Sequence, residues 1–228
     1  MSSGLSLFPI QKITNHRDDG RYRLIHTSEY VFNGLVYRLN YDPSKKGQHP
    51  IRKEIIDAFI MQLHAMQSHY SKIFAFRFDL SVPEGMPVSE SNVLVSNLFE
   101  RLRGRFKKKA WNGQPIKKFA YGWVREKEEA IQAHYHCWIA LPHFQVQTAG
   151  FGKTGMIGLI SELWDELTDD ISRVHLPNGR YSIPRDDHNA LVDFVERISY
   201  LAKNSGKFSS GEGQRIFSTS KLRMNPIN

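Results

Sequence analysis

The sequence has only one cysteine, Cys137, among its 228 residues. A single thiol cannot form a disulfide within the chain, so the sequence predicts a reducing, cytoplasmic setting. No run of about eighteen apolar residues is present, which argues against a membrane span. The first residues also lack the charged segment and apolar core of a secretory signal peptide.

Internal repeats, low-complexity tracts and a nucleotide-binding loop are missing as well. The segment 151–155 contains a Gly-Lys-Thr sequence that superficially resembles a phosphate-binding loop. The full motif requires a second glycine five residues before Gly152, and that position is Gln147. We therefore reject an ATP site in this segment.

Positive charge is abundant. The formal net charge is +8 and the sequence pI is about 9.5, which favours a polyanionic partner. The densest basic stretch consists of Arg101, Arg103, Arg105, Lys107, Lys108 and Lys109. Its cations would complement the negative end of a helix dipole. Because Phe106 and Trp111 are interleaved with them, we interpret the stretch mainly as a surface for nucleic-acid backbone contacts and base stacking.

Hydrophobic periodicity predicts a mixture of helices and antiparallel strands. The expected elements are a strand pair in 22–40 that turns at Asn33-Gly34, a helix in 51–70, a strand in 72–82, a helix capped by Ser89, a hairpin in 118–141, a helix in 154–168, a hairpin in 172–184 and a helix that begins at Asp186 or Asp187. This order predicts an α+β fold in which helices pack on a central antiparallel sheet. Residues 51–228 form the expected main domain. Residues 1–50 are an extension that would either add strands or act as a binding arm.

The most informative motif is His134-Tyr135-His136, which lies in an apolar run that ends at Pro142. This composition predicts a strand, and successive strand side chains point to opposite faces. His134 and His136 therefore share one face, while Tyr135 points to the other. Two imidazoles held in this way supply half of a metal site.

A carboxylate for the same site lies upstream. The run 119–126 reads as the first strand of a hairpin with the histidine strand, which would bring Glu126, or failing that Glu128, beside the two imidazoles. Two histidines and one carboxylate with open coordination positions suit Mg²⁺ or Mn²⁺ during phosphoryl transfer.

A tyrosine and a lysine follow in the last expected helix. Helical spacing places Tyr200 opposite the buried stripe, so the core does not need its side chain. Glu196 and Lys203 are predicted neighbours on the same helix face. A lysine beside a phenol stabilises phenolate or holds the phosphate that the phenolate attacks.

His-x-His on a strand followed by Tyr-x-x-Lys on a helix resembles the HUH endonuclease superfamily. The chain is similar in particular to single-tyrosine initiators of rolling-circle replication from filamentous phages and prophages. The resemblance spans about residues 70–220, and the strand around Phe76-Arg77-Phe78-Asp79 is similar to the family's first motif. It implies His134, His136 and Glu126 as metal ligands, with Asp79 as the next candidate acid, and Tyr200 as nucleophile assisted by Lys203.

The function implied by this resemblance is site-specific nicking of single-stranded or extruded origin DNA. Tyr200 would form a 5′-phosphotyrosine link and free a 3′-hydroxyl, and the strand would later be rejoined. The sequence contains no helicase motif, so a host helicase is an expected partner. Two alternatives stay open: a DNA-binding regulator that keeps the fold without the chemistry, and a metal-dependent nuclease that uses water. RNA is a further possible substrate.

Overall fold

The computed structural model describes residues 12–15, 22–108, 110–126, 133–205 and 214–226. The elements of these ranges are, in chain order, β1 (Ile13–Asn15), β2 (Arg23–Ile25), β3 (Glu29–Phe32), β4 (Leu35–Arg38), β5 (Ile51–Arg52), α1 (Lys53–His69), β6 (Lys72–Ser81), α2 (Val88–Lys108), β7 (Ala120–Glu126), β8 (His134–Pro142), α3 (Gly155–Thr168), β9 (Val174–His175), β10 (Arg180–Pro184), α4 (His188–Ser199), the 3₁₀ turn η1 (Tyr200–Ala202) and β11 (Phe217–Thr219).

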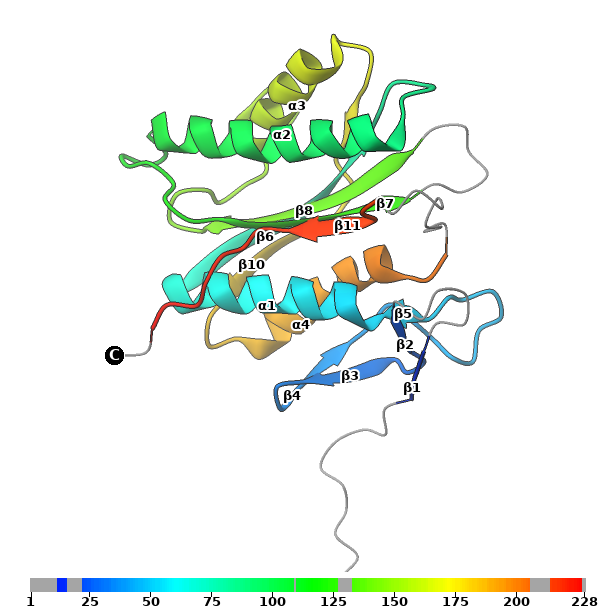
Figure 1. Ribbon diagram of the computed structural model, residues 1–228. Coiled ribbons are helices and arrows are strands. Elements are labelled where there is room, and N and C mark those ends of the chain that lie inside the picture. Colours follow the sequence, from blue (N-terminus) through cyan, green and yellow to red (C-terminus); the bar gives the residue numbers. More distant parts are fainter. Residues whose placement is uncertain (1–11, 16–21, 109, 127–132, 206–213, 227–228) are drawn as a thin grey trace, which may run out of the picture.

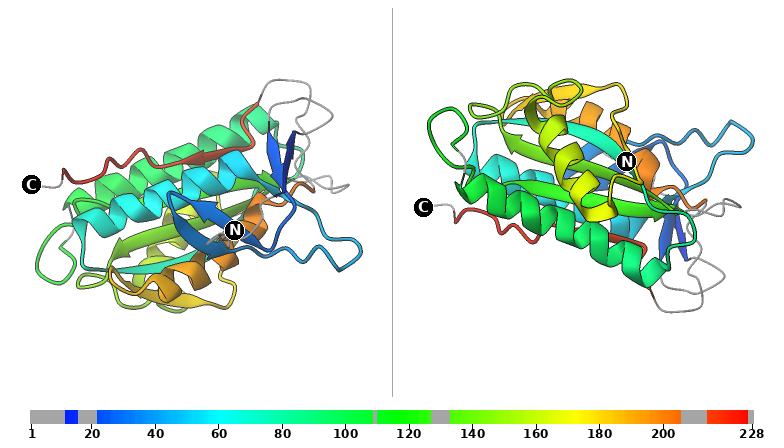
Figure 2. Two further views of the ribbon diagram at one scale, coloured as in Figure 1. Left: turned by 90° about the horizontal axis from the view of Figure 1, so that it is seen from below. Right: turned by 90° about the horizontal axis from the view of Figure 1, so that it is seen from above.

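The main sheet has its strands in the order β10-β6-β8-β7-β11, and β9 also pairs with β6. Every pairing in it is antiparallel. Figure 1 shows α1 and α4 on one face and α2 and α3 on the other, and the two views of Figure 2 show each pair of helices from its own side. The predicted α+β fold with helices on an antiparallel sheet is therefore confirmed, and the histidine strand β8 is central.

Alternation along β8 divides the apolar residues between two cores. Trp138 and Ala140 belong to the core beneath α1 and α4, whereas Tyr135, Cys137 and Ile139 belong to the core beneath α2 and α3. Burial on both faces explains why the strand reads as an unbroken apolar run. The thiol of Cys137 is fully buried, and burial raises its pKa well above the ordinary value.

Gly122 of β7 makes room for the indole of Trp138. A Cβ atom at position 122 would lie 2.4 Å from Trp138 Nε1 and 2.7 Å from Phe59 Cε1. The rings of Phe59 and Trp138 pack edge to face, with their centroids 5.4 Å apart. A glycine inside a strand often marks a close approach of this kind. Here it lets α1 press onto the sheet directly beside the histidine strand.

Two local predictions are confirmed by the backbone. Asn33 and Gly34 both have positive φ, 50° and 78°, and they join β3 to β4 in a tight hairpin. Asp187 is the N-cap of α4, and its carboxylate accepts a hydrogen bond from the backbone N–H of Ala190 at 3.0 Å. The start of the helix that leads to Tyr200 is therefore fixed by its own sequence.

Two other predictions are wrong. The segment 172–184 is not a hairpin, because β9 and β10 pair separately with β6. The long strand β6 offers both short strands an edge whose backbone groups need partners. Helix α2 begins at Val88, so Ser89 lies inside it and does not cap it. The N–H of Ser91 already donates to the carbonyl of Pro87 at 3.0 Å.

The described part of residues 1–50 packs against the α1 and α4 side of the molecule. Tyr30 and Tyr37 are buried in the same core as these helices. Arg38 of β4 forms ion pairs with Asp193 and Glu196 of α4. These strands form two small sheets, β1-β2-β5 and β3-β4, outside the main sheet. Among the described helices, none combines the length and apolar character that a membrane crossing requires.

Candidate active site on the α4 face of the sheet

Three neighbouring strands bring polar side chains to the face covered by α1 and α4. They are Arg77 and Asp79 of β6, His134 and His136 of β8, and Glu126 of β7, each in alternation with residues of the opposite core. The register places Asp79 opposite His136, and Glu126 opposite His134. Antiparallel pairing thus brings residues from three separate parts of the sequence to one point on the sheet.

His136 is held between two carboxylates. Its Nε2 lies 2.7 Å from Glu126 Oε2, and its Nδ1 lies 2.8 Å from Asp79 Oδ1. The three side chains are between 10% and 19% exposed. Burial on its own would lower the pKa of His136, but the hydrogen bonds with Asp79 and Glu126 outweigh this effect and raise the pKa. Both ring nitrogens are therefore fixed in direction.

Arg77 engages both oxygens of Asp79. Its Nε donates to Oδ1 at 2.9 Å and its Nη2 donates to Oδ2 at 3.0 Å. Burial would raise the pKa of the Asp79 carboxyl, but the hydrogen bonds from His136 and Arg77 lower it to about 2. Asp79 therefore stays ionised and orients the Nδ1 side of His136, while Glu126 faces Nε2. The resemblance did not assign a role to Arg77, although its spacing of two from Asp79 places both on one strand face.

Tyr200 lies just beyond the end of α4, not inside the helix as expected. It is the C-cap residue, and it begins the 3₁₀ turn η1. The N–H of Tyr200 bonds to the carbonyl of Ile198, because the last helical turn tightens. The residue is 37% exposed, so part of the tyrosine faces solvent. Glu196, which helical spacing placed beside Tyr200, pairs with Arg38 instead.

Lys203 joins the tyrosine to the histidine centre. Its Nζ donates a hydrogen bond to Tyr200 Oη at 2.9 Å and lies 3.3 Å from Glu126 Oε1. Burial would lower the pKa of Lys203, but the hydrogen bond to Tyr200 and the charge of Glu126 raise it. The guanidinium of Arg77 also lies over the Tyr200 ring, 5.5 Å from its centroid. Strand residues and the tyrosine turn thus form one connected cluster.

The expected metal ligands are only partly assembled. His136 Nε2 and Glu126 Oε2 face each other, so two donors of the expected set already meet at one point. His134 is exposed on the same strand face, two residues before His136, and Glu128 lies outside the described residues. Among the residues that the structure describes, no group of three acids, histidines or cysteines is arranged to hold a metal ion. Two imidazoles and one carboxylate are nevertheless a donor set that divalent cations accept.

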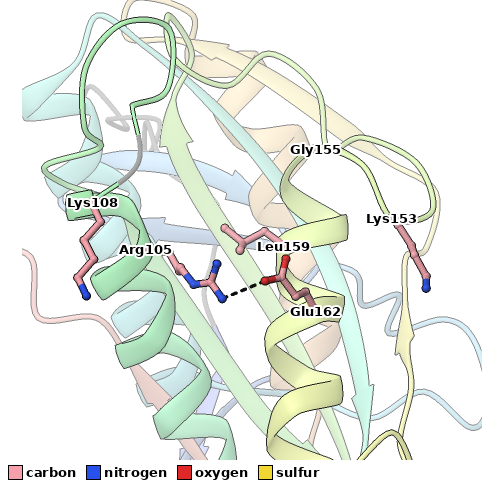
Figure 3. A pocket seen from close by; sticks show the side chains of 6 residues that line it. All are labelled: Arg105, Lys108, Lys153, Gly155, Leu159 and Glu162. Carbon is pink, nitrogen blue, oxygen red and sulfur yellow. Dashed lines mark hydrogen bonds and ion pairs between the residues drawn. The ribbon is translucent and has the colours of Figure 1, made fainter.

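The basic stretch lies far from this cluster in the fold. Residues 101–108 belong to α2, on the opposite face of the sheet from Tyr200. Arg101 pairs with Glu166 of α3, and Arg105 pairs with Glu162, each at 2.9 Å. Figure 3 shows the Arg105–Glu162 contact between the two helices, with the side chain of Lys108 directed away from it.

The other cations of the stretch vary in their surroundings. Arg103 lies 3.6 Å from Glu100. Lys107 and Lys108 are exposed, and Lys109 lies outside the described residues. Arg101, Arg103 and Arg105 each have an acidic side chain nearby, which offsets part of their positive charge. The prediction that this stretch contacts nucleic acid stays a prediction.

Comparison with known proteins gives one match. The family model described as the YagK/YfjJ C-terminal domain matches residues 40–220, a range that contains every residue of the cluster. No curated protein and no solved structure matches the chain.

Proposed function

The chain belongs to the YagK/YfjJ C-terminal domain family, and we propose that it is a metal-dependent DNA nickase of the HUH type that initiates replication. Its substrate is a single-stranded or extruded origin, and its nucleophile is Tyr200. The observation that carries the proposal is the position of Lys203 Nζ, within 2.9 Å of Tyr200 Oη and 3.3 Å of Glu126 Oε1. An accessible phenol is thereby tied to a buried centre of histidine and carboxylates.

Each side chain of the cluster has its own proposed role. His134, His136 and Glu126 are the proposed ligands of Mg²⁺ or Mn²⁺. When bound, the metal would polarise the scissile phosphate and offset its developing charge. Asp79 holds the Nδ1 side of His136, the role that a carboxylate commonly plays behind a ligating histidine. Arg77 keeps Asp79 in place.

Lys203 and Tyr200 perform the bond exchange. Lys203 donates to Tyr200 Oη and stabilises the phenolate that remains when the phenol loses its proton. The phenolate oxygen attacks phosphorus, the bond to the 3′ oxygen breaks, and that oxygen takes up a proton to become a free 3′-hydroxyl. The 5′ phosphate stays linked to Tyr200. Attack by a 3′-hydroxyl on this link reverses the exchange and rejoins a strand without ATP.

A denaturing gel tests the proposal. Purified protein is incubated with Mn²⁺ and a pool of labelled single-stranded oligonucleotides that span a candidate origin. We expect wild type to carry label covalently and Tyr200→Phe to bind the same DNA without a covalent link. A Phe variant that still forms the adduct would refute the role of Tyr200. Cleavage without a protein link would indicate water as nucleophile, and binding without cleavage would favour the regulator.

A further inference from the structure

A second cationic surface lies at the end of the sheet opposite Tyr200. It consists of Lys72 at the start of β6, Lys117 and Lys118 before β7, and Arg223 in the C-terminal segment, and we call these four residues the basic patch. All four are exposed. Figure 1 shows that the end of α1, the segment between α2 and β7, and the C-terminal tail meet at this end of the molecule.

Short contacts join members of the basic patch to two neighbouring histidines. Lys118 Nζ lies 3.3 Å from Nδ1 of His69, at the end of α1, and His69 Nε2 donates to the carbonyl of Arg223 at 2.8 Å. On the other side, the N–H of His143 donates to the carbonyl of Lys72 at 3.1 Å. Burial lowers the pKa of His143, and the charge of Lys72 lowers it further. These contacts connect Lys118 to Arg223 through His69 and place Lys72 beside His143, and Lys117 is the neighbour of Lys118 in the chain.

Within the described residues, the cations of the basic patch have no acidic partner at ion-pair distance. In the described ranges, no ion pair involves any of its four cations. The arginines of α2 differ, because Arg101 and Arg105 face acids of α3. Figure 3 shows the contact between Arg105 and Glu162. Cations without local counter-charges are free to attract the phosphates of a polyanion.

Two aromatic side chains lie among these cations. Tyr70 and Phe144 pack with their ring centroids 6.1 Å apart, and Phe144 is 43% exposed. Burial raises the pKa of the Tyr70 hydroxyl, while a hydrogen bond from the backbone of Lys118 opposes that rise. Unpaired bases stack on accessible aromatic rings while cations hold the backbone, a combination that favours single strands and tolerates any sequence.

We propose that the basic patch binds the single-stranded DNA that flanks the nick, as a second contact for the same strand. This inference rests on the proposed function. Lys72 and Asp79 are seven residues apart on β6, which corresponds to about 23 Å of strand. At a stacked spacing of about 3.4 Å, single-stranded DNA covers this distance in about seven nucleotides. The contact is therefore close enough for an origin strand to reach while Tyr200 engages the scissile phosphate.

Fluorescence anisotropy with labelled dT₃₀ in EDTA tests this surface without any cleavage. The variant is Lys72→Gln/Lys117→Gln/Lys118→Gln. Its matched control, Lys45→Gln/Lys46→Gln/Lys153→Gln, removes the same charge from exposed positions outside the basic patch and outside the basic stretch of α2. We expect the first to bind at least about tenfold more weakly, with a slope of log K against log salt that is shallower by about 2. We expect the control to stay within about twofold of wild type. A separate variant, Arg103→Gln/Lys107→Gln/Lys108→Gln, tests the predicted α2 contact.

Three results would overturn the inference: wild type that does not bind dT₃₀, a patch variant that binds like wild type, or equal losses in the patch variant and its matched control. Vesicles that contain phosphatidylserine form a further arm. Patch-dependent binding to vesicles without binding to dT₃₀ would identify a membrane and overturn the DNA assignment. None of these outcomes depends on the Tyr200 adduct, so the nickase proposal succeeds or fails separately.

Discussion

Lys203 Nζ lies 2.9 Å from the hydroxyl of Tyr200 and 4.3 Å from the centroid of its ring. The ammonium group is thus held against the phenol while Glu126 Oε1 lies 3.3 Å away on its other side. These contacts connect the turn after α4 to Glu126 of β7, which lies opposite His134 of the histidine strand. It also gives Lys203 a function that can be separated from folding.

Replacing Lys203 with glutamine should slow formation of the protein–DNA adduct by roughly 10²-fold, because the developing phenolate loses its cation. Lys203→Arg keeps the charge and should recover part of the rate. Single-turnover adduct formation with Mn²⁺ measures both, and dT₃₀ affinity provides the control, which should not change. Equal rates for wild type and Lys203→Gln would remove the lysine from the mechanism.

Asp79→Asn should destabilise the metal-free protein in a pH-dependent way. The folded pKa of Asp79 is lowered to about 2, so its contribution is present above the unfolded value of about 3.9 and is lost as the pH falls through 2. We expect the free energy of unfolding to drop by about 2 kcal/mol at pH 7 and the difference to shrink below pH 4. Urea titrations across this range, with the exposed Asp170→Asn as control, measure it. If the variant lost the same free energy of unfolding at every pH, this would contradict the lowered pKa of Asp79.

Gly122→Ala should destabilise the fold, because a Cβ atom would lie 2.4 Å from the indole nitrogen of Trp138. Overpacking of this kind costs about 1–3 kcal/mol. Gly104 in α2 has open space around its Cα, so Gly104→Ala should be neutral or stabilising by about 0.5–1 kcal/mol. Urea midpoints of the two variants give the comparison. A Gly122→Ala protein as stable as wild type would mean that the Trp138 packing relaxes easily.

Mn²⁺ should raise the melting temperature of wild type, because a ligand that binds only the folded state stabilises it. Glu126→Gln removes a proposed anionic ligand, and His134→Ala an exposed one, so both should reduce the shift. Thermal melts with increasing Mn²⁺ and an EDTA reference measure it. The mutation Glu162→Gln on α3 should leave the shift unchanged. If Glu126→Gln and His134→Ala both respond like wild type, the metal lies elsewhere.

The sequence predicts the strand-borne part of the site better than the remainder. Period-two alternation places His134 and His136 on one face and Tyr135 on the other, and the structure agrees: the hydroxyl of Tyr135 lies 2.7 Å from that of Ser91 in the α2 side of the core. Alternation depends only on the local chain, so it can be read without knowing the partners of a strand.

Other features depend on contacts between distant segments. In the sequence, Arg77 is an isolated cation within an apolar strand and suggests no role. Its role becomes visible only when strand pairing places its partner Asp79 opposite His136. The pairing of β9 and β10 with the same strand follows from the length of β6, which no local motif encodes. The basic patch is hidden for the same reason, because its cations come from three segments that meet only in the folded chain. By contrast, the basic run of α2 is conspicuous in sequence, yet the acidic partners of Arg101 and Arg105 lie on another helix.

The burial of Cys137 has a practical consequence for labelling. It is the sole cysteine of the chain, and its thiol is fully buried with a strongly raised pKa, so maleimide reagents should leave the native protein unmodified. One cysteine introduced on the surface would then be a unique attachment point for a fluorophore. A dye on a Ser182→Cys variant, at an exposed position of the edge strand β10, would allow single-molecule observation of a bound DNA strand while Cys137 stays in place.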